Sequence, residues 1–458
     1  MSRTSGGWSR VLGGAGLTAV TTLAVTASCA ATPLRVSSVR PISGPVTLTG
    51  CKDARAENTP QVAVDPTNPR HLAATYAIGD GTASVLATSR DAGATWTRTP
   101  ITGTLLCNGG GGHYGVRFDP DLQYGPSGRL YVSESTAGGD SGSNGTNTLV
   151  STVSPGGDAL GPPVPVVTPD AIRGAQRGFL AFEPSIPDYA DVLTERLLYA
   201  AGQYLPVVGS LAISTTTDGG GSFAARTIYS VAPGNSVTAE GLIRHGSTVL
   251  AFGELITDVR GVASLLGQSL VEQLFVLRST DGGQTFGPPL PVFEHAELAD
   301  KVTDCCLLRP VAAPDGTVYI AEPLNGRILV HRSTDSGLSW QAFQAARYTG
   351  VSEPQLAVGP TGTLALSLYE LSKDAKTAHV HVLVSGNQAK NWRDMPVGSA
   401  FAISSLGAID DTSPLGPVQG IAATPNGFVA AMTVGGPMVT AGGSSDVDLI
   451  TIRRRKSR

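Results

Sequence analysis

One turn motif occurs four times in this chain, and it limits the fold more than any other feature. Its pattern is S/T-x-D-x-G-x-S/T-W/F, and each copy follows a short apolar run with the length of a β-strand. The aspartate can accept backbone N–H bonds inside the turn, and the glycine supplies a conformation that a Cβ would hinder. Each copy therefore predicts a hairpin whose aromatic residue begins the next strand. The copies are Ser89–Trp96, Thr216–Phe223, Ser279–Phe286 and Ser333–Trp340.

The spacing of the motif predicts further, degenerate copies. From Asp91 to Asp218 the distance is 127 residues, but from Asp218 to Asp281 it is only 63. A copy should therefore lie near residue 155, where residues 150–157 keep the strand and the turn without the aspartate. Asn387 occupies the aspartate position of a sixth copy, 52 residues after Asp335.

A second repeated element is a turn followed by a short apolar strand, and it occurs seven times. The mean step of about 60 residues suits a four-stranded unit that cannot bury its faces alone and must stack in a ring. We therefore predict an all-β fold, a β-propeller of four-stranded blades, with seven blades favoured and six as the alternative. A strand-like segment at 34–42 is expected to complete the last blade and remove an open edge. The repeated strands lie near Leu72, Leu130, Leu198, Leu250, Val318, Leu364 and Val429.

Composition agrees with this fold and excludes one class of partner. The chain has 57 Gly and 31 Pro among 458 residues, which is typical of short strands joined by tight turns. Charged residues make up only 15%, and the net charge is -4. No basic field for nucleic acid is present.

The four turns resemble the Asp-box, or BNR repeat, of sialidase-like propellers. The resemblance covers residues from about 45 to 453 and implies that the turns lie on the outer rim, away from the site. Sialidases of this type use three arginines, a tyrosine nucleophile and an aspartate acid/base. By resemblance, Asp80 takes the place of the acid/base and Glu353 that of a glutamate on an inner strand. The Phe/Tyr-Arg-Ile-Pro signature is absent, since residues 39–42 read Val-Arg-Pro-Ile.

The N-terminus reads as an export signal. Arg3 and Arg10 precede an uncharged run from Val11 to Cys29. The end of this run, residues 26–29, resembles the lipobox of bacterial lipoproteins, with Cys29 as the lipidated residue. We expect a signal peptide over 1–28, a tether with the blade-closing strand over 29–44, and the propeller over 45–458. An ordinary cleaved signal peptide and a retained membrane anchor are the alternatives.

Four further cysteines leave their pairing open. Outside the cytoplasm they allow three disulfide connectivities. One connectivity joins Cys51 to Cys107 and makes a vicinal disulfide of Cys305 and Cys306. The other two connectivities pair cysteines of distant repeats. The four cysteines are Cys51, Cys107, Cys305 and Cys306.

Acidic residues recur just upstream of the seven turns, where the inner strands are expected to begin. They either accept hydrogen bonds at the turns and strand ends, or they converge on the mouth of the pore and form a ligand site. A convergent ring would need arginines, a cation such as calcium, or raised pKa values to offset its repulsion. Arg55, Arg244 and Arg309 lie close enough in sequence to pair with it. The predicted ligand-binding acids are Glu57, Asp121 (or Asp119), Glu183, Glu240, Asp304 and Glu353, with Gln419 in the seventh place.

The sequence thus predicts an exported, lipid-anchored, monomeric propeller that recognises a glycan or another cell-envelope ligand on its pore face. An exo-sialidase type of glycoside hydrolase and a protein-interaction scaffold are the alternatives. Outside this site, His379 and His381 share one face of an expected strand, which fits either a metal site or an ordinary polar face.

Overall fold

The structure is a computed structural model, and its description covers the greater part of the chain from residue 33 onward. The described residues are 33–44, 46, 57–78, 83–101, 116–137, 147–167, 173–198, 209–232, 235–256, 271–296, 308–406, 415–416, 419–435 and 445–454. No helix in these ranges is both long and apolar enough to cross a membrane.

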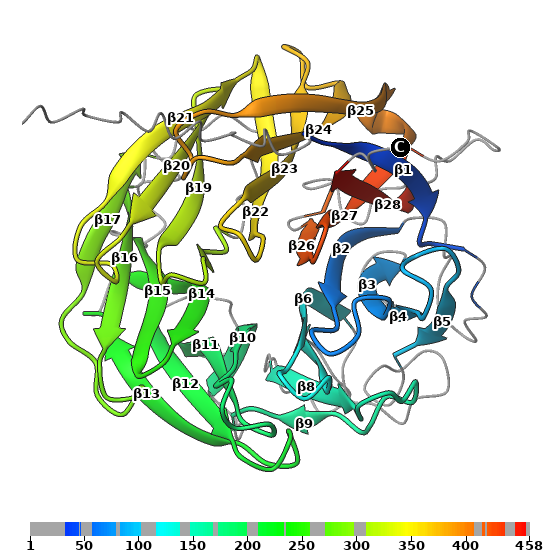
Figure 1. Ribbon diagram of the computed structural model, residues 1–458. Helices are drawn as coiled ribbons and strands as arrows, with labels where there is room; N and C mark the ends of the chain where they lie inside the picture. Colours follow the sequence, from blue (N-terminus) through cyan, green and yellow to red (C-terminus); the bar gives the residue numbers. More distant parts are fainter. Residues whose placement is uncertain are drawn as a thin grey trace, which may run out of the picture. The chain divides into compact units, whose positions relative to one another are not determined.

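Seven four-stranded antiparallel sheets make up the fold, and they stand as blades around a common centre (Figure 1). This confirms the predicted propeller and its seven blades. In each blade the strands run in chain order from the centre outward, except in the last blade. The inner strands are β2, β6, β10, β14, β18, β22 and β26.

The strands of the first four blades have the following bounds. The first blade holds β2 (Glu57–Val64), β3 (Leu72–Ile78), β4 (Ala83–Ser89) and β5 (Thr97–Pro100). The second holds β6 (Val116–Tyr124), β7 (Leu130–Ala137), β8 (Asn147–Val153) and β9 (Val164–Pro165). The third holds β10 (Arg173–Ala181), β11 (Ala190–Leu198), β12 (Ser210–Thr216) and β13 (Ala224–Ser230), and the fourth holds β14 (Ser236–His245), β15 (Thr248–Ile256), β16 (Val271–Ser279) and β17 (Leu290–Ala296).

The remaining three blades complete the ring. The fifth holds β18 (Val311–Ala312), β19 (Val318–Leu324), β20 (Arg327–Ser333) and β21 (Gln341–Arg347). The sixth holds β22 (Gly350–Val358), β23 (Leu364–Leu371), β24 (Thr377–Ser385) and β25 (Arg393–Ala402), followed by the 3-10 turn η1 (Ile403–Ser405). The seventh holds β26 (Gly420–Thr424), β27 (Gly427–Gly435), β28 (Ser445–Arg454) and β1 (Leu34–Pro41).

The seventh blade joins strands from opposite ends of the described chain. β1 pairs antiparallel with β28, with Leu34 opposite Arg454 and Pro41 opposite Asp448. Figure 1 shows the dark blue β1 lying beside the red β28. The closing strand expected from residues 34–42 is therefore present, and it covers the edge that β28 would otherwise expose.

The repeated aspartate turns are hairpin staples, as the sequence predicts. In the third copy, the Ser279 hydroxyl donates to Oδ1 of Asp281 at 2.6 Å and accepts from the N–H of Gly283 at 2.9 Å. Thr285 donates its N–H to Oδ1 of Asp281 at 2.9 Å and its hydroxyl to Oδ2 at 2.6 Å. The copies at Asp91, Asp218 and Asp335 make the same set of bonds.

The sixth-blade copy keeps half of this pattern. Ser385 donates to Oδ1 of Asn387 at 3.0 Å, and the N–H of Asn391 donates to the same atom at 2.9 Å. An amide replaces the carboxylate, and Asn391 replaces the hydroxyl residue. Asn387 is thus the degenerate aspartate that the spacing predicted.

The core lies between the blades. Within the described residues, each of the seven contacts between neighbouring sheets holds one cluster of buried apolar side chains. Between the third and fourth blades, for example, Leu211 packs with Val237 and Phe275. The middle strands of the blades are buried on both faces, so strands such as β3 and β23 read as apolar runs rather than as a strict alternation, whereas the outermost strands are largely exposed.

The third copy of the second repeat is displaced from its predicted position. Leu198 was expected near the start of the second strand, but it is the last residue of β11, which begins at Ala190. The turn between β10 and β11 lies at residues 182–189 and contains no glycine. The sequence of this turn therefore does not resemble the glycine-containing turns of most other blades.

Candidate functional site

A central cavity of about 310 Å³ lies where the inner strands meet. All seven blades contribute to its lining. From each blade we take the lining residue at the equivalent position on or just before the inner strand. We call this set the pore ring, because it encircles the axis between the strands. The pore ring consists of Gln61, Asp121, Phe179, Gly241, Arg309, Gln355 and Gln419.

A break in the inner strands precedes the pore ring. The pairing of β2 with β3 shifts between Asn58 and Gln61, and that of β22 with β23 shifts between Ser352 and Gln355. Similar shifts occur in β6, β10 and β14. Such bulges bend a strand and redirect the side chains that follow. Here they bring the residue after the bulge into the lining of the cavity.

Three of these bulges contain a residue with a left-handed backbone. Thr59, Arg177 and Glu353 have φ values of 53°, 53° and 52°. This conformation is uncommon for residues other than glycine. Since it recurs at equivalent places in three blades, the strain belongs to the fold and does not single out Glu353.

Arg309 is the central residue of the pore ring. It precedes β18, and its Nη1 donates to Oε1 of Gln61 and to Oδ1 of Asp121, each at 2.8 Å. Its Nη2 donates to the carbonyl of Pro120 at 3.3 Å, and the guanidinium carbon lies 5.5 Å from the ring centre of Phe179. One guanidinium from the fifth blade thereby contacts the first, second and third blades.

Asp121 is held by more than this arginine. The N–H of Leu122 donates to its Oδ1 at 2.9 Å, and the N–H of Leu180 donates to its Oδ2 at 3.2 Å. Its side chain is only 3% exposed, and that of Arg309 is 16% exposed. Arg309 and Asp121 therefore form a buried, hydrogen-bonded ion pair, and their two charges sum to zero within the pore ring.

Two buried donors in the pore ring have no partner. They are Nε of Arg309 and Nε2 of Gln61. The orientation of the Gln61 amide follows from chemistry, because arginine only donates and must face the amide oxygen. A buried donor without an acceptor costs about 1–3 kcal/mol. Both nitrogens belong to residues that line the cavity, but the nitrogens themselves are buried, so a ligand oxygen reaches them only if these side chains move.

Glu57 lies apart from this pair, at the start of β2. It is only 7% exposed, and its Oε2 has no hydrogen-bond partner. Burial raises the pKa of Glu57 to about 7, the nearby Asp446 adds to the rise, and Ser43 and Arg98 oppose it. A raised pKa is one of the three ways in which a set of close acids can avoid repulsion, beside arginine partners and a bound cation.

The charge of Glu240 is offset by an arginine. Nη1 of Arg177 donates to Oε1 of Glu240 at 2.6 Å, and the N–H of Leu308 donates to Oε2 at 3.1 Å. Glu353 is buried within the bulge of β22, next to Ser352, which donates to it at 3.4 Å. Neither glutamate lines the central cavity, so those predicted acids that the structure describes do not all meet there.

Glu183 does not lie where it was predicted. It follows the end of β10 and sits in the turn before β11, not at the entrance of the inner strand. The displaced turn described above is the cause of this error. The carboxylate of Glu183 lies 3.6 Å from Nη1 of Arg244, and hydrogen bonds from Ser185 lower its pKa.

Arg244 and Glu183 line a second depression of about 600 Å³, beside the turn that holds Asp281. Arg244 also forms an ion pair with Asp191 and donates to the hydroxyl of Tyr189 at 2.7 Å. Its guanidinium lies 4.8 Å from the ring centre of Tyr189. These contacts join the third and fourth blades next to their turns. Arg244 therefore pairs with Glu183 there and not in the central cavity.

Several predicted residues lie outside the described ranges, and the structure makes no statement about them. They are Cys29, Cys51, Arg55, Asp80, Cys107, Asp304, Cys305 and Cys306. Among the residues that are described, the lining of the central cavity contains one arginine, Arg309.

The sequence analysis named Asp121, Arg309 and Gln419 but not the other members of the pore ring, which are Gln61, Phe179, Gly241 and Gln355. Gln61, Arg309 and Gln355 each lie four residues before a turn. The first residue of that turn donates its N–H to the carbonyl oxygen of the last residue of the turn. Asp121 has the same spacing to Gly125. Counting back from the turns would have aligned these four positions. The recurring acids point to Glu57 instead, which lies four residues before Gln61.

Comparisons with known proteins identify the fold. An ulvan lyase, from a new family of polysaccharide lyases, matches with a TM-score of 0.53 at 10% identity, over 89% of this chain and 96% of that one. The α-L-arabinanase of Penicillium chrysogenum matches with a TM-score of 0.46 at 13% identity, over 76% of this chain and 98% of that one. The sialidase of Trypanosoma rangeli matches with a TM-score of 0.43 at 9% identity, over 79% of this chain.

This chain spans 56% of the length of the sialidase. The sequence matches no protein family model, and it matches none of the curated proteins. At these identities the matches concern architecture alone. The protein is thus a seven-bladed β-propeller whose architecture is similar to that of the ulvan lyase.

Proposed function

We propose that this protein binds a glycan in its central cavity, through the unused donors of Arg309 and Gln61. The observation that carries the proposal is the presence of two buried N–H groups without acceptors in a cavity of about 310 Å³. Sugars present hydroxyl and ring oxygens that suit such donors. The fold neighbours named above act on carbohydrates, so glycans are the first ligands to test.

The charge of the pore ring favours an uncharged acceptor. The Arg309 guanidinium is already neutralised by Asp121 at 2.8 Å. A ligand carboxylate that approached Nε of Arg309 would come close to the Asp121 carboxylate, and two like charges at such range repel in a buried site. A hydroxyl, ring oxygen or amide carbonyl of a neutral glycan meets no such repulsion. Apolar neighbours such as Leu122 and Leu356 offer contact surface for the carbon faces of the sugar.

The cellular setting belongs to the same proposal. We infer that residues 1–28 are removed during export, that Cys29 carries the lipid, and that the four aspartate turns are Asp-boxes of a sialidase-like propeller. The support is the charged start, the uncharged run and the lipobox-like residues 26–29. The protein would then present its pore to ligands outside the cytoplasm.

A glycan array tests this function directly. The full chain, purified in a mild detergent, is applied to an array of neutral and sialylated glycans, and hits are measured by calorimetry. Gln61→Leu removes one unused donor, and we expect binding weaker by about 5-fold to 10-fold, as for one lost hydrogen bond. Gln341→Leu, at an exposed strand position on the outer edge of the fifth blade, is the matched control. Equal binding by wild type and Gln61→Leu would exclude the pore ring as the site.

The exo-sialidase alternative has its own assay. It requires turnover of a fluorogenic sialoside that depends on Asp80 and Glu353. Activity in the wild type that is lost in Asp80→Asn would favour hydrolysis over recognition alone.

A further inference from the structure

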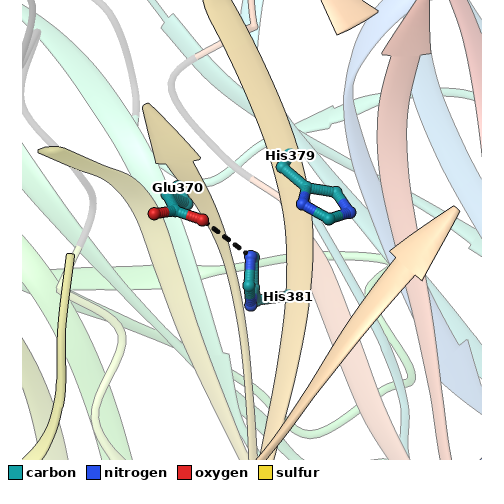
Figure 2. Close-up of side chains that lie close together, drawn as sticks. All are labelled: Glu370, His379 and His381. Carbon is teal, nitrogen blue, oxygen red and sulfur yellow. Dashed lines mark hydrogen bonds and ion pairs between the residues drawn. The ribbon is translucent and has the colours of Figure 1, made fainter. Parts of the chain in front are cut away.

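We propose that Glu370, His379 and His381 form a binding site for a divalent transition-metal ion such as zinc, on the sixth blade and outside the central cavity. Their ligand atoms all lie within 4.8 Å of one another. Figure 2 shows the Glu370 carboxylate turned toward the ring of His381, with the ring of His379 beside it. None of the three residues lines the central cavity, so this site is separate from the proposed glycan site.

The geometry of the sheet brings the three residues together. His379 and His381 are two positions apart on β24, so their side chains leave the same face of the sheet. Glu370 on β23 stands directly opposite His379 in the antiparallel register. Cross-strand neighbours of this kind have Cβ atoms about 5 Å apart, which is within reach of a shared ion.

Hydrogen bonds determine which nitrogen of His381 is left for a metal. Nδ1 of His381 lies 2.9 Å and 3.0 Å from the two carboxylate oxygens of Asp394, so it carries a proton and donates. Asp394 is fixed in turn by the hydroxyl of Tyr348 at 2.8 Å. A carboxylate that orients a histidine in this way is the usual outer partner of a metal-binding imidazole.

The remaining nitrogen of His381 faces an acceptor. Its Nε2 lies 3.1 Å from Oε2 of Glu370, and that carboxylate has no proton to offer when ionised. A neutral imidazole presents a lone pair at this nitrogen, so two acceptors meet. A cation must hold them together, and it is either a second proton on His381 or a metal ion between the two groups.

His379 favours the metal. Its Nε2 lies 3.3 Å from the carbonyl oxygen of Gly398, to which it donates. This contact leaves Nδ1 of His379 as the nitrogen with a free lone pair. The site therefore combines two imidazole nitrogens and one carboxylate oxygen, a donor set that suits zinc, cobalt, nickel or copper better than calcium.

Small side-chain movements complete the coordination. Ligand atoms around tetrahedral zinc are about 3.4 Å apart, given zinc–nitrogen bonds of about 2.1 Å. The present separations reach 4.8 Å, so at least one ligand must turn inward. The Glu370 side chain is 35% exposed and is free to do so, whereas His381 is 7% exposed and anchored by Asp394. Three protein ligands leave a further position for water or a ligand oxygen.

Metal titration tests the proposal. The full chain is freed of metal with a chelator, and zinc chloride is added in a calorimeter. Cobalt chloride in a parallel sample gives a visible absorption band when it is bound in a low-coordinate site with nitrogen ligands. We expect one equivalent of zinc to bind with a Kd below 10 μM (an order-of-magnitude expectation), and His379→Gln to weaken it by about 30-fold.

A matched histidine provides the control. His245 is exposed and His379 half-buried, and Nε2 of His245 lies 3.3 Å from the carbonyl oxygen of Pro314, just as Nε2 of His379 lies 3.3 Å from that of Gly398. His245→Gln should leave zinc binding unchanged. Glu370→Gln provides a second variant at an accessible position and should also weaken binding.

Two outcomes would overturn the proposal. If the wild type binds no zinc at about 100 μM free metal, the cation between His381 and Glu370 is a proton alone. If His379→Gln and Glu370→Gln bind zinc as tightly as His245→Gln does, the metal is held elsewhere.

Discussion

Nη1 of Arg309 lies 2.8 Å from Oδ1 of Asp121, although the two residues belong to the fifth and second blades. Their ion pair therefore connects parts of the ring that share no strand contact. It also sets the charge of the pore ring to zero. Stability and binding should both depend on this one contact.

Removing the arginine alone should destabilise the fold. Arg309→Met leaves the Asp121 carboxylate buried with only backbone donors, and breaking a buried pair typically costs about 3–5 kcal/mol. The double variant Arg309→Met/Asp121→Leu removes both charges and should recover most of that loss. Urea unfolding of the wild type, both single variants and the double variant measures the coupling energy. Simple addition of the two single effects would show that the residues act independently.

Glu57 should make the protein less stable as the pH rises. Its folded pKa of about 7 lies above the ordinary value of 4.5, so the folded state holds a proton that the unfolded state has lost between these limits. The free energy of unfolding therefore falls as pH rises from 4.5 to 7, by at most roughly 3 kcal/mol from this group.

Glu57→Gln separates this effect from other titrations. The variant should match the wild type below pH 4.5 and be more stable at pH 8, as measured by urea unfolding at each pH. A constant difference across the whole range would mean that Glu57 titrates normally.

The degenerate turn of the sixth blade can be repaired. Asn387→Asp combined with Asn391→Thr would restore the carboxylate and hydroxyl that the other turns use. Hydrogen bonds from Thr95 and Ser89 lower the pKa of the equivalent Asp91 to about 2. A carboxyl group with a lowered folded pKa stabilises the fold above its unfolded pKa, and the gain disappears as pH falls through the folded value.

We therefore expect the double variant to have a higher Tm than the wild type at pH 7 and a much smaller advantage near pH 2. Thermal unfolding followed by circular dichroism provides both values. A Tm advantage of the same size at pH 2 would contradict the role assigned to the carboxylate.

Lipidation at Cys29 predicts membrane retention. When the full chain is expressed in a bacterium that processes lipoproteins, the wild type should fractionate with membranes and incorporate labelled fatty acid. Cys29→Ser should lose the label. Labelling that persists in Cys29→Ser would remove the lipoprotein proposal and leave the other export alternatives to be compared.

The fold could be predicted because its units repeat. Four copies of one turn, together with Asn387, give the period, and the period gives the blades. The closing strand followed from the same reasoning, since the last repeat lacks a fourth strand and residues 34–42 form a strand that covers the edge of β28. The error at Leu198 arose at the turn of residues 182–189, which lacks the glycine that most of the other turns contain and does not resemble them in sequence.

The site was less predictable because its residues do not repeat. The pore ring holds an acid, a base, an aromatic residue, a glycine and three amides at equivalent positions. No pattern search for one residue type finds such a set. The pairing of Arg309 with an acid was predicted, but the partner could not be chosen without knowing which blades face each other across the pore.

The pairing of β1 with β28 has a consequence for how this protein is made. Leu34 finds its partner, Arg454, only after every other blade has been synthesised. Contacts between such distant positions form slowly, because a long loop must close before they contribute. If the chain crosses a membrane unfolded and N-terminus first, the first strand to emerge must wait, unpaired, for the last. Chaperones on the far side would have this strand to protect until the circle is complete.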